Sequence, residues 1–407
     1  MKILQINTFY KHGSTGRIVY DIQKMCELCG YDNYVAFGCK TSCYDEQRNL
    51  CLQGWLRRKW NILKTRVLGR HGFYNKSETS KLINYINQLQ PDIIHLHNIH
   101  NHFINIEILF NYIKEKNIPI IWTLHDCWPF TGWCSYFDYV KCNKWETQCN
   151  DCPSLNDYPR TWFFDRSLSN FNKKRKIFTG VNNLTLVTPS KWLASLTQKS
   201  FIKEYPTKVI NNGVDIEIFK PVKSKIKEKL GVSNKNILLA IAANLAKRKG
   251  AEDLIKLPQM LEENEILIVL GVTQKQLQIL PREKCIGITY TENIQELVEL
   301  YSAADVFLNP TYEDNFPTTN IESLACGTPV ITYNTGGSIE AINEETGYVV
   351  EQGDLIEMLR LSREIIKKGK SSYQNCCRNR AVEFYDRSKQ YQEYIKLYMN
   401  ILNDIKS

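Results

Sequence analysis

The stretch "EDNFPTTNIESLACGTPVITYNTGG", Glu313–Gly337, decides the fold. It predicts a short helix that begins near Pro317 and ends near Gly327, followed by a buried strand that starts at Pro329. The apolar run just before it predicts a strand that ends at Pro310. The order strand, helix, strand is typical of a parallel sheet, in which ligands bind at the carboxyl ends of the strands.

Strand-like apolar runs alternate with helical stretches along the whole chain. They are KILQIN, NYVAFG, DIIHLH, PIIWTLHD and LTLVTPS in the first half, and NILLAIAAN, EILIVLG, CIGITY, DVFLNP and PVITYN in the second. Continuous apolar strands separated by helices indicate parallel sheets covered on both faces. The pattern pauses in the polar, lysine-rich stretch 211–236. We therefore predict an α/β protein with two doubly wound, Rossmann-like domains, 1–212 and 213–380, facing each other across a cleft, and a C-terminal helix, 381–407, that returns to the first domain.

Length, composition and charge indicate an ordinary globular protein with two domains. The chain has 407 residues, of which 43% are apolar and 23% charged, and its net charge of +9 favours anionic partners. No apolar stretch reaches the roughly 18 residues of a spanning helix, and the N-terminus lacks the pattern of a signal peptide. We therefore expect a cytoplasmic protein whose 14 cysteines are thiols or metal ligands rather than disulfides.

A cluster of cysteines follows the middle of the first domain, and its members are Cys134, Cys142, Cys149 and Cys152. The spacing, which ends in a C-x2-C pair, suits tetrahedral zinc. The segment is poor in aliphatic residues, so a metal would help it to hold its shape. We predict a structural zinc site, with free thiols that pack a loop as the alternative, and we do not expect Cys127 to be a ligand.

Acidic and basic side chains lie near the ends of two predicted strands of the second domain. Asp314 precedes the helix that starts near Pro317, and Glu322 is one turn into it. Carboxylates can bind sugar hydroxyls, and the free amides of a helix N-terminus suit a phosphate. Lys249 follows the strand "NILLAIAAN" and could meet the charge of a departing diphosphate.

These motifs resemble the signature of glycosyltransferase family 4, a group of retaining enzymes with the GT-B fold. In that family an acidic residue, seven intervening residues and a Glu flank the donor nucleotide sugar. Asp314 and Glu322 match this pattern, with Asp where the family usually has Glu, and "SLACGTPVI" extends the match. The family binds the donor diphosphate with an Arg and a Lys five residues apart. Lys249 matches the Lys, Asn244 stands at the Arg position, and Arg248 is a candidate to supply the missing charge.

The resemblance extends into the first domain. Gly13 and Gly16 match a glycine-rich loop after the first strand, and His125 matches a histidine that lines the reaction centre. A plain turn and a structural histidine are the alternatives. The motif "HDCWPFTGWC" and the cysteines after it resemble a subgroup of the colanic acid and O-antigen type. For the nearby histidines, packing and lining of the cleft are favoured over a metal site; they are His95, His97, His100 and His102.

The resemblance implies a transfer of sugar from a UDP- or GDP-sugar to a glycan acceptor, expected to be lipid-linked, in bacterial surface polysaccharide synthesis, with no cofactor required for catalysis. Residues 1–212, with a cysteine-rich insertion at 127–153, would be the acceptor side, and 213–380 would bind the donor. The implied catalytic residues are His125, Asp314 and Lys249. The implied donor-binding residues are Gly13, Gly16, Asn244, Arg248, Lys249, Asp314, Asn315, Phe316, Thr318, Thr319 and Glu322. The alternatives are a nucleotide-sugar epimerase of the same fold and a non-catalytic, zinc-stabilised sugar- or nucleotide-binding protein.

Residues 52–76 predict a basic amphipathic helix. They contain seven Lys or Arg residues and no acid, and an apolar stripe consists of Leu56, Trp60, Leu63 and Val67. Such a helix can lie on an anionic membrane, here the cytoplasmic face of the inner membrane, or it can pack on the core with its basic residues in solvent. No nucleic-acid reader motif is present, so we expect no nucleic-acid partner.

Overall fold

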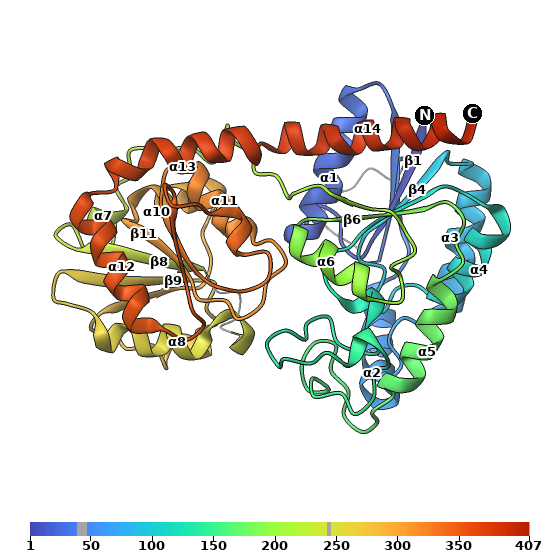
Figure 1. Ribbon diagram of the computed structural model, residues 1–407, viewed down its shortest axis with the longest axis horizontal. Coiled ribbons are helices and arrows are strands. Elements are labelled where there is room, and N and C mark those ends of the chain that lie inside the picture. The colour runs from blue at the N-terminus through green and yellow to red at the C-terminus, as the bar shows by residue number, and fades with distance from the viewer. Residues whose placement is uncertain (39–46, 242–245, 407) are drawn as a thin grey trace. The chain divides into compact units, whose positions relative to one another are not determined.

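The structure is a computed structural model that describes residues 1–38, 47–241 and 246–406 (Figure 1). The chain forms two compact units. Unit 1 comprises Met1–Asn211 and Tyr391–Ser407, and unit 2 comprises Asn212–Gln390. The cleft predicted between two domains stays a prediction.

Unit 1 is built on a seven-stranded sheet in which every pair of neighbouring strands is parallel, in the order β3-β2-β1-β4-β5-β6-β7. The strands are β1 (Lys2–Asn7), β2 (Asp32–Phe37), β3 (Asn49–Cys51), β4 (Ile93–Leu96), β5 (Ile120–Thr123), β6 (Leu184–Thr188) and β7 (Thr207–Val209). The strand order reverses between β1 and β4, and ligands of such sheets bind beyond the carboxyl ends of the strands at this point.

Helices cover both faces of this sheet because successive strand residues point to opposite sides. On β1, Leu4 and Ile6 join a core formed with α3 and α4, whereas Ile3 joins a core formed with α1 and α14. The helices are α1 (Gly13–Leu28), α2 (Trp55–Leu68), α3 (Lys76–Leu89), α4 (Ile106–Lys116), α5 (Ser167–Phe178), α6 (Lys191–Lys199) and α14 (Arg387–Lys406). Two 3-10 turns are η1 (Trp128–Phe130) and η2 (Lys144–Glu146).

Unit 2 has a six-stranded parallel sheet in the order β10-β9-β8-β11-β12-β13, which reverses between β8 and β11. The strands are β8 (Asn236–Ile241), β9 (Glu265–Leu270), β10 (Cys285–Ile288), β11 (Val306–Asn309), β12 (Val330–Tyr333) and β13 (Gly347–Val350). The helices are α7 (Ile226–Lys229), α8 (Ala251–Lys256), α9 (Gln274–Leu277), α10 (Ile294–Ala303), α11 (Thr318–Ala325), α12 (Leu355–Lys368) and α13 (Ser371–Phe384). The predicted α/β class with two doubly wound sheets is therefore confirmed.

Each apolar run that was predicted to be a strand is a strand, but the sequence prediction missed β3, β7 and β13. All three lie at the edges of their sheets. An edge strand pairs on one side only and is short and partly exposed, so it lacks the continuous apolar run that marks a central strand.

The C-terminal segment predicted as one helix, 381–407, contains a break. Helix α13 ends at Phe384 and α14 begins at Arg387. Between them, Val214 N–H donates to Tyr385 O (2.8 Å), and Arg387 N–H donates to Val214 O (3.0 Å). The main chain at the break is therefore paired with another segment instead of continuing the helical hydrogen-bond pattern.

The stretch Glu313–Gly337 folds as predicted, and Gly250 allows another loop to pack closely beside it. Helix α11 is preceded by Pro317 as its N-cap residue, and Gly327 follows it with φ +73. The loop after β8 approaches the end of β11 so closely that a Cβ on Gly250 would lie 2.1 Å from Pro310 O. Gly250 also has φ +75, a conformation that side chains disfavour.

The close approach at Gly250 predicts a large difference between two glycine substitutions. Gly231 has φ +68 but nothing within 4 Å of its Cβ position. We expect Gly231→Ala to lower the free energy of unfolding by about 1 kcal/mol, the cost of the left-handed backbone. Gly250→Ala should lower it by about 3 kcal/mol or more, because the clash adds to that cost. Urea unfolding of both variants measures the difference, and equal values would contradict the close approach.

Candidate functional site

Lys249 and Asp314 meet at the point of unit 2 where the strand order reverses. Lys249 ends a 3-10 turn (Lys247–Lys249) after β8, and Asp314 lies on the loop after β11. Their side chains form an ion pair and are 23% and 16% exposed. Burial by itself would raise the pKa of Asp314, but the charges of Lys249 and Arg248 hold it below its ordinary value. The Asp314 carboxylate is therefore ionised at neutral pH.

Arg248 belongs to the same cluster but faces the main chain. Its Nη1 donates to Glu313 O (2.5 Å), and its own carbonyl accepts from Tyr312 N–H (2.8 Å). These bonds tie the loop after β8 to the loop after β11. Asn244, at the position where the resembled family has its Arg, lies outside the described residues.

The paired glycines after β12 explain why Asp314 is held in place. A Cβ on Gly336, which has φ +49, would lie 2.2 Å from Asp314 O. Gly337 N–H donates to the same carbonyl (3.0 Å), and Thr335 Oγ1 donates to Tyr312 O (2.8 Å). The loop after β12 thus clamps the main chain that carries the carboxylate. This contact was missed from the sequence, although the glycine pair was its signal.

The first turn of α11 presents amides that its N-cap side chain does not bond. Pro317 has no side-chain acceptor, and Asn320 N–H donates to Pro317 O (3.2 Å), so the amides that can meet water or a ligand are those of Thr318 and Thr319. Thr318 and Thr319, in this first turn, are partly buried. The Phe316 ring packs in the core against Tyr385, with ring centroids 5.6 Å apart, so this residue can contribute to a site only through its main chain.

Glu322 is oriented by a residue that sequence reasoning missed. The hydroxyl of Tyr301 on α10 donates to Glu322 Oε2 (2.9 Å). Buried amides fix the helix itself, because Asn309 Nδ2 donates to Asn320 Oδ1 (2.8 Å) and Asn320 Nδ2 donates to Ser338 Oγ (3.1 Å). Nothing in local sequence reveals these pairs, since their members come from β11, α11 and the loop after β12. Asn315, beside Asp314, is also buried.

In unit 1, His125 follows β5 and is held by a chain of hydrogen bonds. Gln5 Nε2 donates to Val19 O (3.0 Å), so its Oε1 accepts from His97 Nε2 (3.0 Å). His97 Nδ1 is then an acceptor, and His125 Nε2 donates to it (3.1 Å). Burial lowers the pKa of His125 to about 4. His125 is therefore a neutral imidazole at pH 7, with Nδ1 as its acceptor nitrogen.

Gly13 and Gly16 lie on the turn that begins α1. Gly13 has φ +67 and is the first residue of the helix. A Cβ on Gly16 would lie 3.3 Å from the main chain of Phe9, and Lys11 N–H donates to Gly16 O (3.0 Å). The turn follows β1, which is next to β4 at the reversal of the strand order. The loop therefore occupies the ligand-binding edge of sheets of this kind.

The other histidines form two groups, one in which His95 stacks on His97 and one in which His100 and His102 lie beside His71. His95 is bonded to Tyr398 Oη on α14 (2.7 Å) and to Thr123 (2.8 Å). His100 Nε2 lies 2.8 Å from Asp126 Oδ2. The expectation that strand alternation separates these side chains is wrong for His95 and His97, whose buried rings lie 4.0 Å apart between centroids.

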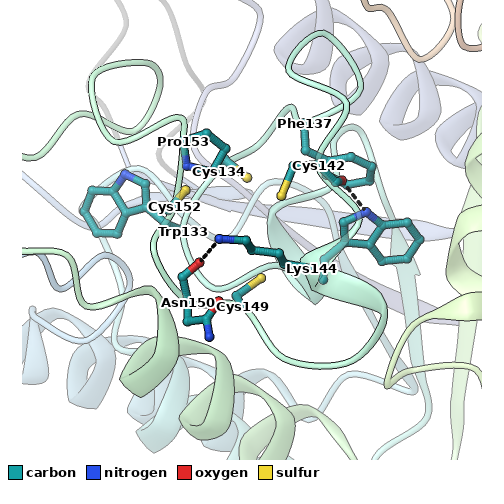
Figure 2. A pocket seen from close by; sticks show the side chains of 10 residues that line it. Trp133, Cys134, Phe137, Cys142, Lys144, Cys149, Asn150, Cys152 and Pro153 are labelled. Carbon is teal, nitrogen blue, oxygen red and sulfur yellow. Dashed lines mark hydrogen bonds between the residues drawn. The ribbon is translucent and has the colours of Figure 1, made fainter.

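The four clustered cysteines line one small pocket, which is formed by the chain segment that connects η1 to α5 (Figure 2). Cys134 and Cys149 are buried, and Cys142 and Cys152 are partly exposed. In the part of the chain that the structure describes, no three His, Cys, Asp or Glu side chains are arranged so that they could hold a metal ion as they stand. The zinc prediction thus has its candidate ligands in one place, without a formed ligand shell.

Comparison with known proteins gives consistent results for both halves of the chain. The model "Glycosyltransferase Family 4" matches residues 57–218, and "Glycosyl transferases group 1" matches residues 222–382. The chain is 24% identical over 421 residues to WcaC of Escherichia coli strain K12, described as a colanic acid biosynthesis glycosyl transferase, with 98% of this chain and 100% of that protein aligned.

Solved structures of the same fold cover nearly the whole chain. Sucrose-phosphate synthase from Thermosynechococcus elongatus superposes with a TM-score of 0.74 at 15% identity, covering 99% of this chain and 100% of that one. Anabaena HepE in complex with UDP-glucose gives 0.65 at 17% identity, covering 98% and 100%. At these identities the likeness shows the fold alone, which is GT-B. With both family models matched in succession, the chain belongs to the family 4, group 1 glycosyltransferases.

Proposed function

We propose that this glycosyltransferase transfers a sugar from a UDP- or GDP-sugar to a glycan acceptor with retention of configuration. The observation that carries the proposal is the grouping, at the strand reversal of unit 2, of the Lys249–Asp314 pair with the first turn of α11. A cation, helix amides and a carboxylate are what a sugar diphosphate needs at one edge of a sheet. The complex of HepE with UDP-glucose supports the choice of donor class.

The proposed roles follow from charge. The ammonium of Lys249 and the amides of Thr318 and Thr319 meet the pyrophosphate, whose charge grows as the bond to the sugar breaks. Asp314 accepts hydrogen bonds from the transferred sugar, and Glu322, oriented by Tyr301, accepts those of the ribose. Before the donor binds, Lys249 and Asp314 neutralise each other, so the donor must replace this ion pair with contacts of its own.

The reaction itself exchanges one bond at the anomeric carbon. The bond to the diphosphate oxygen breaks, the acceptor oxygen forms its bond on the same face, and its proton passes to the departing diphosphate. Lys249 and the helix amides supply positive charge, so we propose that catalysis needs no cofactor. From unit 1, Gly13 and Gly16 permit close approach of a ligand, and His125 Nδ1 accepts a hydrogen bond from a sugar hydroxyl.

Helix α2 supports a lipid-linked acceptor, because it faces solvent with its apolar stripe. Its buried residues are the polar Asn61 and Thr65. The Asn61 side chain donates to Asn75 Oδ1, and Thr65 Oγ1 is bonded to His102 Nδ1 (2.9 Å). Trp55, Leu56 and Trp60 are 64%, 74% and 57% exposed. An ordinary surface helix buries its apolar stripe instead. Helix α2 thus packs on unit 1 through Asn61 and Thr65, with Arg57 and Lys59 in solvent, while Leu56 and Trp60 of its apolar stripe stay exposed.

An aromatic loop, Trp162–Phe164, extends this surface. Trp162 N–H donates to Arg66 O at the end of α2 (2.7 Å), and the three aromatic residues are 46%, 70% and 48% exposed. Basic side chains lie over rings of both sets: Lys59 Nζ is 3.7 Å from the Trp55 ring centroid, and the Arg66 guanidinium carbon is 5.6 Å from that of Trp162. Exposed tryptophan beside Lys and Arg suits the interface of an anionic membrane.

We propose that α2 and the aromatic loop hold unit 1 on the cytoplasmic face of the inner membrane, where a lipid-linked glycan would be reached. Within the described part of the chain, no helix has the length and apolar composition needed to cross a bilayer. The name of WcaC, which refers to colanic acid biosynthesis, supports a pathway of bacterial surface polysaccharide synthesis.

The first test is the release of nucleoside diphosphate from UDP- and GDP-sugars in the presence of lipid-linked acceptors. We expect Glu322→Gln to lower kcat/KM about 10- to 100-fold, because a charged hydrogen bond of about 1.5–3 kcal/mol is lost. Glu364→Gln is the matched control, since Glu364 also accepts from a tyrosine hydroxyl (Tyr348, 2.9 Å) outside the candidate site. Conversion of donor sugar without acceptor would favour the epimerase, and no turnover of any donor would favour the binding protein.

The ion pair predicts opposite behaviour of two variants toward plain UDP or GDP. Lys249→Met should weaken nucleoside diphosphate binding about tenfold or more, because a cation facing the phosphates is lost. Asp314→Asn should leave this binding equal or tighter, since Lys249 no longer has a competing carboxylate, while sugar transfer falls. Calorimetric titration measures both affinities. Equal weakening by the two substitutions would contradict these roles.

The exposed helix predicts binding to anionic vesicles. The wild-type protein should sediment with vesicles of phosphatidylglycerol and phosphatidylcholine but not with phosphatidylcholine alone, and salt should weaken binding. Replacing both Trp60 and Phe163 by Ala should lower the affinity roughly tenfold. Tyr290→Ala, which removes a 76% exposed aromatic of unit 2, is the control. Unchanged binding of the double variant would exclude this surface.

A further inference from the structure

The segment between η1 and α5 contains almost no regular secondary structure. Apart from the short turn η2, residues 131–166 form turns and irregular chain. Phe137 and Trp145 stack with ring centroids 4.8 Å apart, Phe130 lies 5.3 Å from Trp145, and these rings join the core of unit 1. A segment with so few main-chain hydrogen bonds needs a further constraint to keep one conformation.

Four thiols gather where such a constraint could act. Cys134, Cys142, Cys149 and Cys152 all line the pocket, although they are spread along the segment, and their sulfur atoms are drawn in Figure 2. All the cysteines that the structure describes are free thiols. The side chains of Cys134 and Cys152 are within hydrogen-bond contact. Only Cys149 and Cys152 are close in sequence, so the fold of the segment brings the other two cysteines to the same pocket.

Burial raises the pKa of the Cys149 thiol to about 12, and one main-chain amide opposes this by donating to its sulfur. Gly132 N–H donates to Cys149 Sγ (3.2 Å). A Cβ on Gly132 would lie 2.3 Å from Ser167 O, so glycine is needed to bring this amide against the sulfur. Lys144 Nζ, which lines the same pocket, donates to two main-chain oxygens, those of Asn150 and Asp151 (3.0 Å each), and holds the loop between the last two cysteines.

A buried lysine next to the cluster is the second, independent observation. Lys174 on α5 is 1% exposed, and its Nζ donates to Trp128 O (2.7 Å) and Thr131 O (3.0 Å). Burial lowers the pKa of Lys174 well below its ordinary value, whereas Cys134, Cys149 and Asp126 act in the opposite direction. Its Nζ also lies 3.5 Å from the centroid of the Trp128 ring. Thiolates beside Lys174 would favour its protonated form, whereas neutral thiols leave the effect of burial unopposed.

We propose that the four thiols of this pocket bind one zinc ion, which fixes the segment between η1 and α5. Zinc takes four thiolates in tetrahedral geometry, and binding releases the thiol protons to solvent. The resulting centre, Zn²⁺ with four thiolates, has a net charge of −2 and lies beside the buried Lys174. The ligand shell is not formed in the present conformation, so zinc must draw the sulfurs together. The irregular chain between the cysteines allows this movement.

Metal analysis of the purified full-length protein tests the proposal. Protein prepared with reductant and zinc chloride, then passed through a desalting column, should retain about one zinc per chain by mass spectrometry. Cys149→Ser and Cys152→Ser should each reduce the retained zinc several-fold. Cys127→Ser is the matched control, because this buried thiol immediately precedes η1 and does not line the pocket.

A measurement on the wild-type protein covers the case in which the variants fail to fold. Removal of metal with a strong chelator should lower Tm by several degrees, and zinc chloride should restore it. Wild-type protein that retains no zinc and has the same Tm with and without chelator would overturn the proposal. So would a disulfide between Cys134 and Cys152 in protein prepared with reductant. Neither result depends on sugar transfer, so the zinc site can fail while the proposed function stands.

Discussion

Parallel pairing of neighbouring strands constrains this protein more than any other feature. A parallel pair needs a crossover connection, so each strand must be followed by a segment long enough to return to the start of the next. All strands then end at one edge of their sheet, and the connecting loops gather there. In both units the strand order also reverses after the third strand, which leaves two neighbouring loops that diverge from each other. The candidate side chains of each unit lie on these loops or beside them.

The Lys249–Asp314 pair, at the carboxyl ends of the strands of unit 2, is held by loops with a fixed main chain and is largely buried. Lys249 and Asp314 come from different loops, and each loop is fixed through main-chain atoms rather than through the charges. Gly250 lies against the end of β11, and Gly336 lies against the carbonyl of Asp314. Glycine is required at both points because a side chain would occupy the space of the neighbouring backbone. The Lys249–Asp314 ion pair can therefore open to bind a ligand while both loops keep their conformation.

Unit 1 combines a rigid interior with an unusual outer surface. The chain from Gln5 through His97 to His125 fixes the tautomer of a buried histidine at the end of β5. In contrast, α2 buries polar side chains and exposes tryptophan and leucine, which costs hydrophobic stabilisation unless something covers them. A membrane surface and a zinc-bound segment that supports the aromatic loop would each account for part of this arrangement.

The sequence by itself determined the parallel α/β class and the central strands, because buried strands are continuous apolar runs. It also determined the boundaries of α11, because proline and glycine have few alternatives at those positions. The edge strands, the break before Arg387 and the partners of Glu322 and Asp314 were decided only by the tertiary structure. Amphipathic periodicity likewise revealed that α2 has two faces but not which one is buried. These features depend on contacts between distant segments, such as Tyr301 with Glu322 and Gly336 with Asp314, and a local pattern of residues does not specify its partner.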